Sequence, residues 1–389
     1  MPALSVILTT YNKPRDLERS LAGLRQQAFQ DFEVLVCDDG SGPETAAVVE
    51  GFAADAPFPV HHVWQEDAGF RAARSRNNGA RRAQGETLVF VDGDVVAFPD
   101  FLEVHRRAQR EGWFFAGERY LTSEEQAATI GVAAIEDRSA YALVPPAERR
   151  RLTKLRWKNR FYRASGLKPE RPALMTCNCS VPLALFRGVN GLDERYEGWG
   201  QEDEDLRRRL VMQGAKVGSV IGQANGLHLW HPADKTFLGK RRQSPNWRYY
   251  DRGFHLSRCR RGLVERPLRE LAGAVLGDAS RRAELVASLG WAPEIADAPR
   301  EVALWIDDGS SQPAWPPCEV RVLLSAEPAP ARSGGADLVL GPGLPTAGGE
   351  LPGEVHPELP DAWRGAAKAL RPVDPQDAAA VRDALDRIL

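Results

Sequence analysis

Buried strands and amphipathic helices alternate through the first hundred residues, and this alternation constrains the fold more than any other feature. Apolar runs predict strands at residues 3–10, 32–37, 59–64 and 87–94. Helical patterns begin at Pro14 and cover residues 43–54 and 71–84. Alternation of this kind implies right-handed crossovers between parallel strands. It predicts an α/β domain with a mostly parallel sheet and a nucleotide-type crevice at the strand ends.

Polar side chains follow three of these strands at the point where each one ends. The first strand ends with Thr9 and Tyr11, the second with Asp39, and the fourth with the D-x-D pair Asp92 and Asp94. Tyr11 could stack on a base, and Asp39 could accept a hydrogen bond from a base N–H. The D-x-D pair could bind a divalent cation through carboxylate oxygens. Each feature alone is more often a surface loop, but three at consecutive strand ends indicate a site.

The same strand ends exclude two common kinds of nucleotide site. No G-x-G-x-x-G follows the first strand, which argues against a dinucleotide-binding enzyme. No G-x-x-x-x-G-K-[ST] occurs, which excludes ATP hydrolysis of the P-loop type. A metal and arginines would then neutralise phosphates, and the helix predicted after Gly69 offers Arg71, Arg74 and Arg76 near its start.

The stretch GWGQEDEDL at residues 198–206 holds four adjacent acidic side chains, and these repel one another. Such a cluster is either a solvated helix start or a chemical tool. Glu204 and Asp205, followed by LRRRL, favour the first turn of a helix, where acids suit the helix dipole. That interpretation leaves Glu202 and Asp203 as candidates for chemistry.

A basic stretch at residues 148–163 has two interpretations. It could be a solvated helix or mobile loop, or it could contact an anionic surface such as a lipid-diphosphate acceptor at a membrane or an acidic glycan. Trp157, Phe161 and Tyr162, which lie among the charges, favour the second interpretation slightly. The net charge of −2 argues against a nucleic-acid partner. No apolar run is long enough to span a membrane, and the five scattered cysteines suit a reducing compartment, so we expect a cytoplasmic protein.

Two segments resemble the nucleotide-sugar-binding half of inverting family 2 glycosyltransferases with the GT-A fold. They are residues 9–41 (TTYNKPRDLERSLAGLRQQAFQDFEVLVCDDGS) and residues 74–94 (RSRNNGARRAQGETLVFVDGD). GWGQEDEDLRRRL, preceded by NCSVPLALFRGVNGLDERY, resembles the acceptor half of the galactosyltransferase-like branch, which includes the chondroitin-polymerase type. The resemblance covers roughly residues 3–250 and does not extend to residues 300–389.

This resemblance implies a role for each matching residue. The uridine would be held by Thr9, Tyr11 and Asp39. The diphosphate would lie near Arg71 and Arg76. Asp92 would face the ribose, and Asp94 would bind the metal. In the acidic cluster, Asp203 would be the catalytic base, and Glu202 would orient the acceptor or the loop. Trp199 would be a stacking platform for sugar, and the adjacent Gly200 would let its loop move.

The resemblance also implies a second metal ligand. A histidine in an H-x-x-D-K context completes the metal shell in the galactosyltransferase-like branch, and His231 occupies that place in HPADK. His228, three residues earlier, is the next choice. Taken alone, the pair would more often be two ordinary polar residues at a strand end. Imidazole beside carboxylate and diphosphate oxygens suits Mn²⁺ better than Mg²⁺.

These observations predict a metal-dependent, inverting hexosyltransferase that uses a UDP-linked sugar and a glycan or lipid-linked acceptor, with possible peripheral contact at the inner face of a membrane. The competing hypotheses are a catalytically silent binding or scaffold protein and a sugar nucleotidyltransferase, which would need a Gly-rich loop where this chain has TTYN. The expected domains are a donor half at residues 1–115, an acceptor half at 116–250, a basic helical extension at 251–300, and a small α/β accessory domain at 301–389 with final helices near 361–370 and 374–389.

Overall fold

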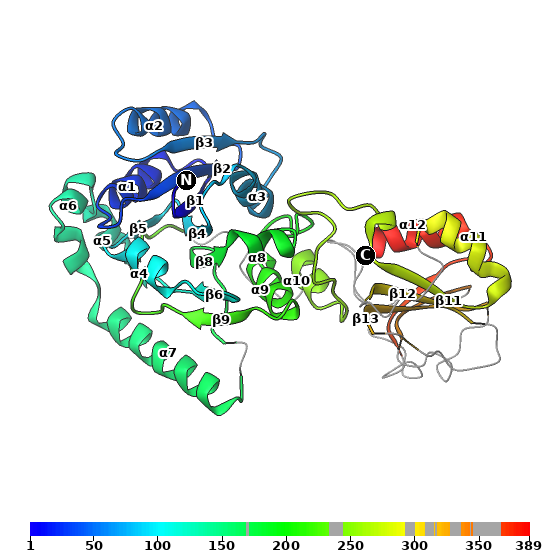
Figure 1. The fold of residues 1–389 in the computed structure, drawn as a ribbon. Helices are drawn as coiled ribbons and strands as arrows, with labels where there is room; N and C mark the ends of the chain where they lie inside the picture. The colour runs from blue at the N-terminus through cyan, green and yellow to red at the C-terminus, as the bar shows by residue number, and fades with distance from the viewer. Residues whose placement is uncertain are drawn as a thin grey trace. The chain divides into compact units, whose positions relative to one another are not determined.

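The computed structural model describes residues 1–168, 171–232, 244–291, 300–307, 315, 317–326, 336–342, 344 and 367–389. The chain forms two compact units, Met1–Leu238 and Gly239–Leu389, and each has its own sheet (Figure 1). Within the described ranges, no helix combines the length and the apolar composition needed to cross a membrane.

The first unit is built on a seven-stranded sheet with the order β3-β2-β1-β4-β8-β6-β9. Its strands are β1 Leu4–Thr10, β2 Phe32–Asp38, β3 Val60–Trp64, β4 Thr87–Asp92, β6 Trp113–Ala116, β8 Asn178–Pro182 and β9 Lys216–Ser219. All neighbours are parallel except β8, which runs antiparallel to β4 and β6. The α/β class and the first four predicted strands are therefore confirmed, with strand ends within two residues of those expected.

A second, three-stranded sheet lies in the same unit. It consists of β5 Val95–Ala97, β10 Gly226–His228 and β7 Tyr120–Leu121, in that order. The helices of the unit are α1 Pro14–Arg25, α2 Pro43–Ala53, α3 Ala72–Arg82, α4 Phe101–Ala108, α5 Glu124–Thr129, α6 Val132–Glu136, α7 Pro146–Ser165, α8 Leu183–Gly188 and α9 Glu202–Met212, with a 3₁₀ turn at Ser139–Leu143. The predicted helices at 43–54 and 71–84 correspond to α2 and α3.

The start of the chain shows why this sequence folds as it does. Proline at the first position of α1 needs no hydrogen-bond partner for its nitrogen, so Pro14 starts the helix. Leu17, Leu21 and Leu24 are spaced for one helical face, and all three are buried in the core between α1 and the sheet. The strands β1, β2 and β4 are buried on both faces, as expected for continuous apolar runs.

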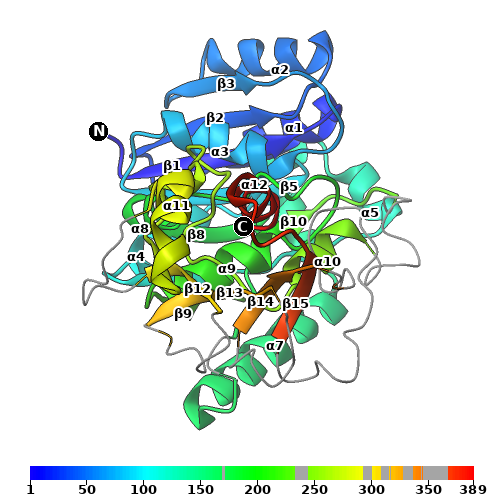
Figure 2. The same ribbon diagram turned by 90° about the vertical axis from the view of Figure 1, so that its right-hand side faces the viewer.

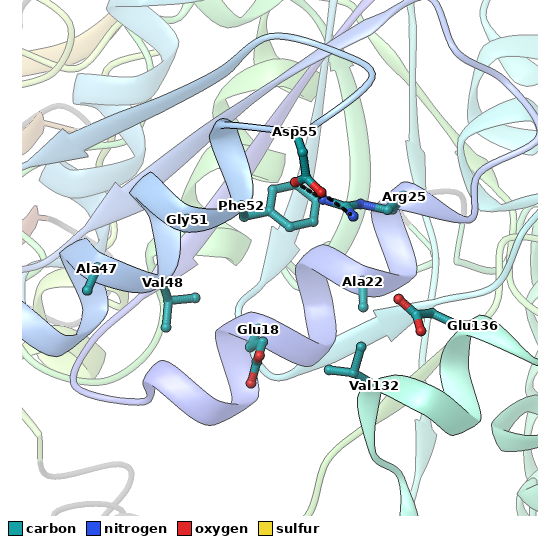
Figure 3. A pocket seen from close by; sticks show the side chains of 10 residues that line it. All are labelled: Glu18, Ala22, Arg25, Ala47, Val48, Gly51, Phe52, Asp55, Val132 and Glu136. Atoms are coloured by element: carbon teal, nitrogen blue, oxygen red, sulfur yellow. Dashed lines mark hydrogen bonds and ion pairs between the residues drawn. The ribbon is translucent and has the colours of Figure 1, made fainter.

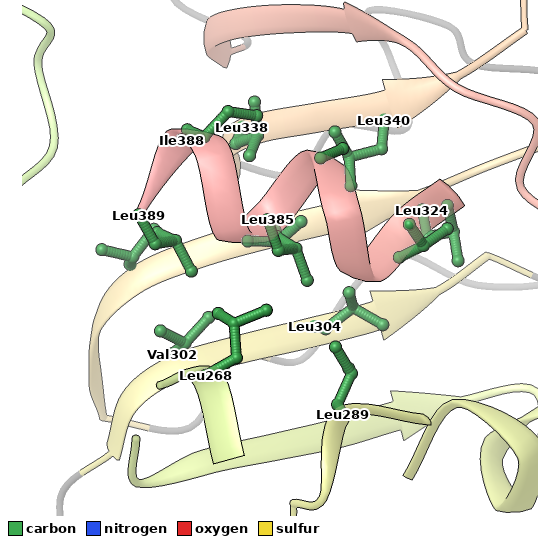
Figure 4. Close-up of a cluster of buried hydrophobic side chains, with 14 of the residues drawn as sticks. Leu268, Leu289, Val302, Leu304, Leu324, Leu338, Leu340, Leu385, Ile388 and Leu389 are labelled. Atoms are coloured by element: carbon green, nitrogen blue, oxygen red, sulfur yellow. The ribbon is translucent and has the colours of Figure 1, made fainter. Parts of the chain in front are cut away.

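The second unit is a five-stranded parallel sheet in which the strands follow one another in chain order (Figure 2). They are β11 Gly273–Gly277, β12 Arg300–Ile306, β13 Cys318–Leu324, β14 Ala336–Gly341 and β15 Ala367–Pro372. The helices are α10 Pro245–Tyr250, α11 Ala279–Leu289 and α12 Ala378–Ile388, with a 3₁₀ turn at Leu268–Glu270. Figure 4 shows α12 lying across the sheet, with Leu385 and Ile388 above the side chains of Leu304 and Leu338.

The first unit ends at Leu238, so the expected ends of the acceptor half at residue 250 and of the basic helical extension at residue 300 do not match this division. β6 and β8 join β1–β4 in one sheet, so the expected donor and acceptor halves form a single unit. β11 pairs with β12, so the expected basic helical extension contains a strand of the C-terminal sheet. The helix expected near 361–370 is wrong over residues 367–370, which begin β15 because they pair in parallel with β14, and Ala369 and Leu370 are buried there. Residues 361–366 lie outside the described ranges, and the last helix is confirmed as α12.

Candidate active site

A cavity of about 510 Å³ lies at the carboxyl ends of β1, β2 and β4 in the first unit. Its lining includes Thr9, Tyr11, Asp39, Arg76, Asp92, Asp94, Trp199, His228 and His231. These are nine of the thirteen residues that the sequence predicted as site residues. The others, Arg71, Gly200, Glu202 and Asp203, lie outside the lining of this cavity.

Strand register brings the lining residues together. Thr9 of β1 lies opposite Cys37 of β2 and opposite Asp92 of β4, so the three strands end at the same level. Gly93 then turns tightly against β1 and donates its N–H to the Thr9 carbonyl at 2.7 Å. A Cβ atom at Gly93 would lie 2.9 Å from that carbonyl oxygen, so only glycine fits without displacement of the backbone. This turn presents the carboxylates on either side of it to the cavity.

The second sheet places two histidines beside the end of the D-x-D pair. β10 runs antiparallel to β5, with His228 opposite Val95, and the N–H of Leu229 donates to the Asp94 carbonyl at 2.8 Å. His231 Nε2 lies 3.2 Å from Asp94 Oδ2, and His228 Nε2 lies 3.6 Å from Asp94 Oδ1. One potential ligand atom from each of the three residues lies within 4.8 Å of the others. The Asp234-Lys235 part of the predicted histidine motif lies outside the described residues.

The protonation of this cluster suits a cation. Burial opposes ionisation of Asp94, but the hydrogen bond with His231 and the positive charge of Lys13 hold the pKa of Asp94 below its ordinary value. Burial lowers the pKa of His228 to about 4, so its imidazole is neutral near pH 7, as a metal ligand must be. The hydrogen bond with Asp94 raises the pKa of His231 against the effect of burial.

The residues present fit a divalent metal ion. Asp94 Oδ1 is buried and accepts no hydrogen bond from the described residues, while Lys13 Nζ lies 3.0 Å from Oδ2. The carboxylate therefore attracts positive charge and retains an acceptor that the described chain leaves unused. One carboxylate with two imidazoles is a donor set suited to Mn²⁺ and, less well, to Mg²⁺.

Arg76 of α3 joins the floor of the cavity to the acidic cluster. Its guanidinium is buried and donates to Thr9 Oγ1 at 3.0 Å, to Asp92 at 3.0 Å and to Glu202 at 3.3 Å. Burial alone would lower the pKa of Arg76, but the carboxylates of Asp92 and Glu202 raise it. The predicted role of Arg76 at the diphosphate stays a prediction, since three partners already share its nitrogens.

The predicted base-binding residues lie at the other end of the cavity. Asp39 is buried and accepts the backbone N–H of Arg71 at 2.7 Å and a second bond from Gln65. Burial raises the pKa of Asp39 against the effect of these two donors. Tyr11 is 42% exposed, and its hydroxyl donates to Asp67 at 2.9 Å. The guanidinium of Arg71 donates to the carbonyl of Glu66, so Arg71 supports the site through its backbone.

The acidic cluster begins α9, and its four carboxylates have different environments. Asp203 Oδ2 accepts the backbone N–H of Thr176, and Glu204 pairs with Arg207 at 2.6 Å. Asp205 is buried and pairs with the buried Arg209 at 2.7 Å. The helix-start interpretation of Glu204 and Asp205 is therefore confirmed.

Glu202 is also buried, and it differs from its three neighbours because it pairs with Arg76, which lines the cavity. Burial and the adjacent Asp203 raise the pKa of Glu202 well above its ordinary value, although Arg76 opposes this shift. The backbone before α9 is left-handed at Gly198, Gly200 and Gln201, with φ of 78°, 94° and 78°. Glycine adopts a left-handed conformation at low energy, so the two glycines favour this backbone conformation. It places Trp199 on the cavity wall.

Sequence reasoning missed two cationic residues of the lining. Lys13 directly follows the first strand end, so its position was a signal that could have been used. Arg119 precedes β7, and Nη1 lies 3.2 Å from Glu118 and 3.1 Å from Cys177 Sγ. Its stretch of sequence carries no periodic pattern or motif, so only the fold brings Arg119 to the cavity.

A second cavity, of about 350 Å³, lies between α1, α2 and α6 (Figure 3). Its charged lining includes Arg25 and Asp55, which pair at 2.6 Å, together with Glu18 and Glu136. Val48, Phe52 and Val132 supply the apolar part of the wall. None of the predicted site residues lines this cavity, so we place the candidate active site in the larger one.

Two parts of the chain match known protein families. Residues 5–167 match the family described as "Glycosyl transferase family 2", and residues 159–231 match "N-terminal domain of galactosyltransferase". The first part of the chain is thus similar to glycosyl transferase family 2, and the galactosyltransferase-like segment that follows contains Trp199, the acidic cluster and both histidines. The GT-A type of α/β fold implied by the resemblance is consistent with the sheets described above.

Individual relatives cover part of the chain. It is 33% identical over 246 residues to validoxylamine A glucosyltransferase of Streptomyces hygroscopicus subsp. jinggangensis, covering 59% of this chain and 56% of the relative. It is 24% identical over 259 residues to chondroitin synthase of Escherichia coli, covering 56% and 34%. The chain spans about half the length of the first curated relatives it matches. Among solved structures, S. aureus TarS 1–349 in complex with UDP-GlcNAc is similar over 64% of each chain, with 17% identity and a TM-score of 0.45.

Proposed function

We propose that the chain is a metal-dependent, inverting glycosyltransferase that transfers a hexose-type sugar from a UDP-sugar to a hydroxyl of a glycan or lipid-linked acceptor. The strongest support for this proposal is that Asp94, His228 and His231 lie close together, beside Asp92, in one cavity. These ligands come from separate motifs of the donor and galactosyltransferase-like segments. A catalytically silent relative would have no need to keep them together.

The cavity offers a place for each part of a nucleotide sugar. Tyr11 and Asp39 supply a ring and a carboxylate for the base at one end, and Asp92 is placed for the ribose. A Mn²⁺ or Mg²⁺ ion held by Asp94, His228 and His231 would neutralise the diphosphate. Arg119 and Lys13 add positive charge on the same wall. Trp199 presents an exposed indole on which the acceptor sugar can stack.

The reaction we propose is a single in-line displacement. The acceptor hydroxyl oxygen bonds to C1 of the donor sugar while the bond from C1 to the diphosphate oxygen breaks, so the anomeric configuration inverts. The hydroxyl proton passes to the carboxylate of Asp203, and the nucleoside diphosphate leaves with the bonding electrons. General-base help of this kind contributes about 10²–10⁴-fold in rate. Glu202, tied to Arg76, would hold the start of α9 in place beside the donor.

The names of two relatives suggest the direction for substrate screening. One is a glucosyltransferase and the other a chondroitin synthase, so UDP-linked hexoses and N-acetylhexosamines come first as donors. We further propose that transfer occurs on the cytoplasmic side, where nucleotide sugars and reduced thiols coexist.

The test is a thermal-shift screen of nucleotide sugars with and without Mn²⁺, followed by measurement of nucleoside diphosphate released with acceptor. A donor that binds should raise the melting temperature by mass action, and more so with Mn²⁺ present. We expect excess chelator to abolish turnover and Mn²⁺ to restore it. Full turnover in excess chelator would contradict the metal assignment.

Asp94→Ala should fold normally but show no metal-dependent shift and no turnover. Asp55→Asn is the matched control, because it also removes an acidic charge but lies at the second cavity. Donor binding without release of nucleoside diphosphate for any acceptor would favour a silent binding protein. Formation of a nucleotide sugar from a sugar phosphate would identify a nucleotidyltransferase.

A further inference from the structure

Helix α7 (Pro146–Ser165) stands out from the rest of the first unit in both views (Figures 1 and 2). It carries eight basic residues and one acidic residue, Glu148. The basic residues are Arg149, Arg150, Arg151, Lys154, Arg156, Lys158, Arg160 and Arg163. The proposed transfer reaction uses none of them, and neither cavity described above includes a residue of this helix.

The helix has an inner and an outer face. Leu152 and Asn159 are buried, and Leu155, at helical spacing between them, packs against the same core cluster as Leu152. These contacts fix the rotation of α7 about its own axis. The side chains on the opposite side therefore point away from the unit.

The outer face combines positive charge with large apolar rings. Arg150, Lys154, Trp157, Lys158 and Phe161 follow one another at helical spacing, and all five are exposed. Trp157 is 62% exposed and Phe161 is 61% exposed, which is unusual for two large apolar side chains one turn apart. We define these five residues as the outer strip of α7.

Cations lie over one ring of this strip and over the adjacent Tyr162. The Arg160 guanidinium lies 5.5 Å from the centre of the Trp157 ring, and Lys158 Nζ lies 5.8 Å from that of Tyr162. Just beyond the helix, Leu167 is 68% exposed. Exposed apolar side chains among long basic ones suit the boundary between lipid head groups and acyl chains. There the rings can be buried while the cations contact lipid phosphates.

We propose that the outer strip of α7 binds the surface of an anionic lipid bilayer, with Trp157 and Phe161 at head-group depth and the lysines and arginines on lipid phosphates. Charge complementarity favours such a surface, since the helix is strongly basic while the whole chain has a net charge of −2. An acidic glycan is the weaker candidate, because the strip is a convex helix face whose rings gain little from a hydrated polymer. The proposal goes beyond the transfer reaction and does not depend on it.

The experiment is co-sedimentation of the full chain with vesicles of pure phosphatidylcholine or of phosphatidylcholine with 30–40% phosphatidylglycerol. Phosphatidylglycerol gives these vesicles a negative surface potential, which attracts polybasic segments. We expect binding to the anionic vesicles only, and we expect it to weaken as salt is raised from about 0.05 to 0.5 M because the attraction is screened. No binding to anionic vesicles at low salt would overturn the proposal.

Two variants test the strip itself. Lys154→Glu with Lys158→Glu should lower the vesicle partition coefficient by at least about 25-fold, from roughly 5-fold for each basic residue near the surface. Trp157→Ala with Phe161→Ala should lower it by about 10-fold through lost apolar burial. Arg82→Glu with Arg187→Glu is the matched control, since it makes the same change of charge at exposed positions of α3 and α8.

The control should bind as the wild type does, and circular dichroism should show that all variants stay folded. Equal loss of binding in the control and in the lysine variant would mean that vesicle binding comes from the general charge of the protein and not from the strip. That result would contradict the proposal. Tight binding to a soluble acidic glycan that the lysine variant loses, with unchanged vesicle binding, would assign the strip to glycans and also overturn it. Both results are distinguishable from failure of the transfer reaction, because neither assay requires turnover.

Discussion

At the scale of single residues, Arg76 shows how the two halves of the site are connected. One buried guanidinium contacts Thr9 of β1, Asp92 of β4 and Glu202 of α9. The sequence predicted Arg76 as a site residue but not these partners, because they come from strands and a helix that are distant in the chain. Loss of the guanidinium would leave the buried carboxylate of Glu202 and the partly exposed one of Asp92 without their shared cation.

We therefore expect Arg76→Lys to be damaging although it keeps the charge. A lysine ammonium cannot reproduce a planar group that serves three partners. Unfolding free energy should fall by about 3 kcal/mol, the lower end for breaking a buried charge pair, and donor affinity should fall as well. Urea unfolding and nucleotide titration measure the two effects, with Arg82→Lys on the exposed side of α3 as the control. Wild-type stability in Arg76→Lys would show that the network is dispensable.

Asp203 and its neighbours can be separated by isosteric changes. Asp203→Asn keeps the size of the side chain but cannot accept the acceptor's proton, so turnover should fall by about 10²-fold or more with donor affinity near wild type. Glu204→Gln should change stability by less than about 1 kcal/mol and leave turnover intact. Glu202→Gln should act mainly through the KM for acceptor. Normal turnover in Asp203→Asn together with inactive Glu202→Gln would move the base by one residue.

Asp205→Asn, by contrast, should destabilise the protein more than the sequence suggested. The sequence indicated only a helix start, where an acid contributes about 0.3–1 kcal/mol through the helix dipole. In the structure Asp205 and Arg209 form a buried pair, and removing one charge from such a pair costs about 3–5 kcal/mol. Comparing the urea midpoints of this variant and Glu204→Gln tests that difference directly.

At the scale of elements, the helices and strands that are long enough to show a hydrophobic period could be predicted from the sequence. β1–β4 and α1–α3 follow from apolar runs, helical spacing and Pro14, and each of their ends lies close to the predicted one. The sites at the strand ends could be predicted for the same reason, since parallel strands share an edge. Short strands such as β5, β7 and β10 could not be predicted, because three or fewer residues carry no period. These strands nevertheless position His228 beside Asp94.

The packing of α4 on β8 gives a pH-dependent prediction. His105 is fully buried, with Nε2 3.0 Å from Asn178 Oδ1 and Nδ1 2.9 Å from Ser180 Oγ. Because the amide nitrogen of Asn178 already donates to two carbonyls, Nε2 carries the proton and Nδ1 accepts. Burial lowers the pKa of His105 to about 4, although the hydrogen bond with Asn178 opposes the shift.

Between pH 6.5 and about 4 the unfolded chain binds a proton at His105 that the folded chain excludes. Stability from this residue is thus complete above pH 6.5 and is lost as pH falls, by on the order of 3 kcal/mol in total. His105→Gln should flatten the pH dependence of the unfolding free energy in that window. His61→Gln, at an exposed histidine, should leave the slope unchanged, and an unaltered slope in His105→Gln would contradict the assignment.

At the scale of the whole molecule, the boundary between the two units changes how the chain should be cut. The predicted domain boundary at residue 300 would favour truncation just before it, near residue 298. That cut would leave β11 without β12, and it would expose Val275 and Leu285, which pack in the C-terminal core. We now expect a chain ending at 298 to aggregate.

A chain ending after Leu238 should instead stay monomeric and bind the donor normally, because every residue lining the candidate active site belongs to the first unit. Size-exclusion chromatography and nucleotide titration of the two truncations provide the test. Loss of nucleotide affinity in the shorter chain would show that the second unit completes the donor pocket.

The strand order of the two sheets has a consequence for the order of folding during synthesis. In the second unit each strand pairs with the one made just before it, so the sheet can grow as the chain leaves the ribosome. In the first unit, β6 pairs with β8 and β9, which are completed 66 and 103 residues after Ala116. Until then, the backbone groups of β6 lack these hydrogen-bond partners, and the apolar side chains of Phe114 and Phe115 lack their packing partners. The stretch around β6 is therefore the part of the first unit most in need of protection from aggregation during synthesis.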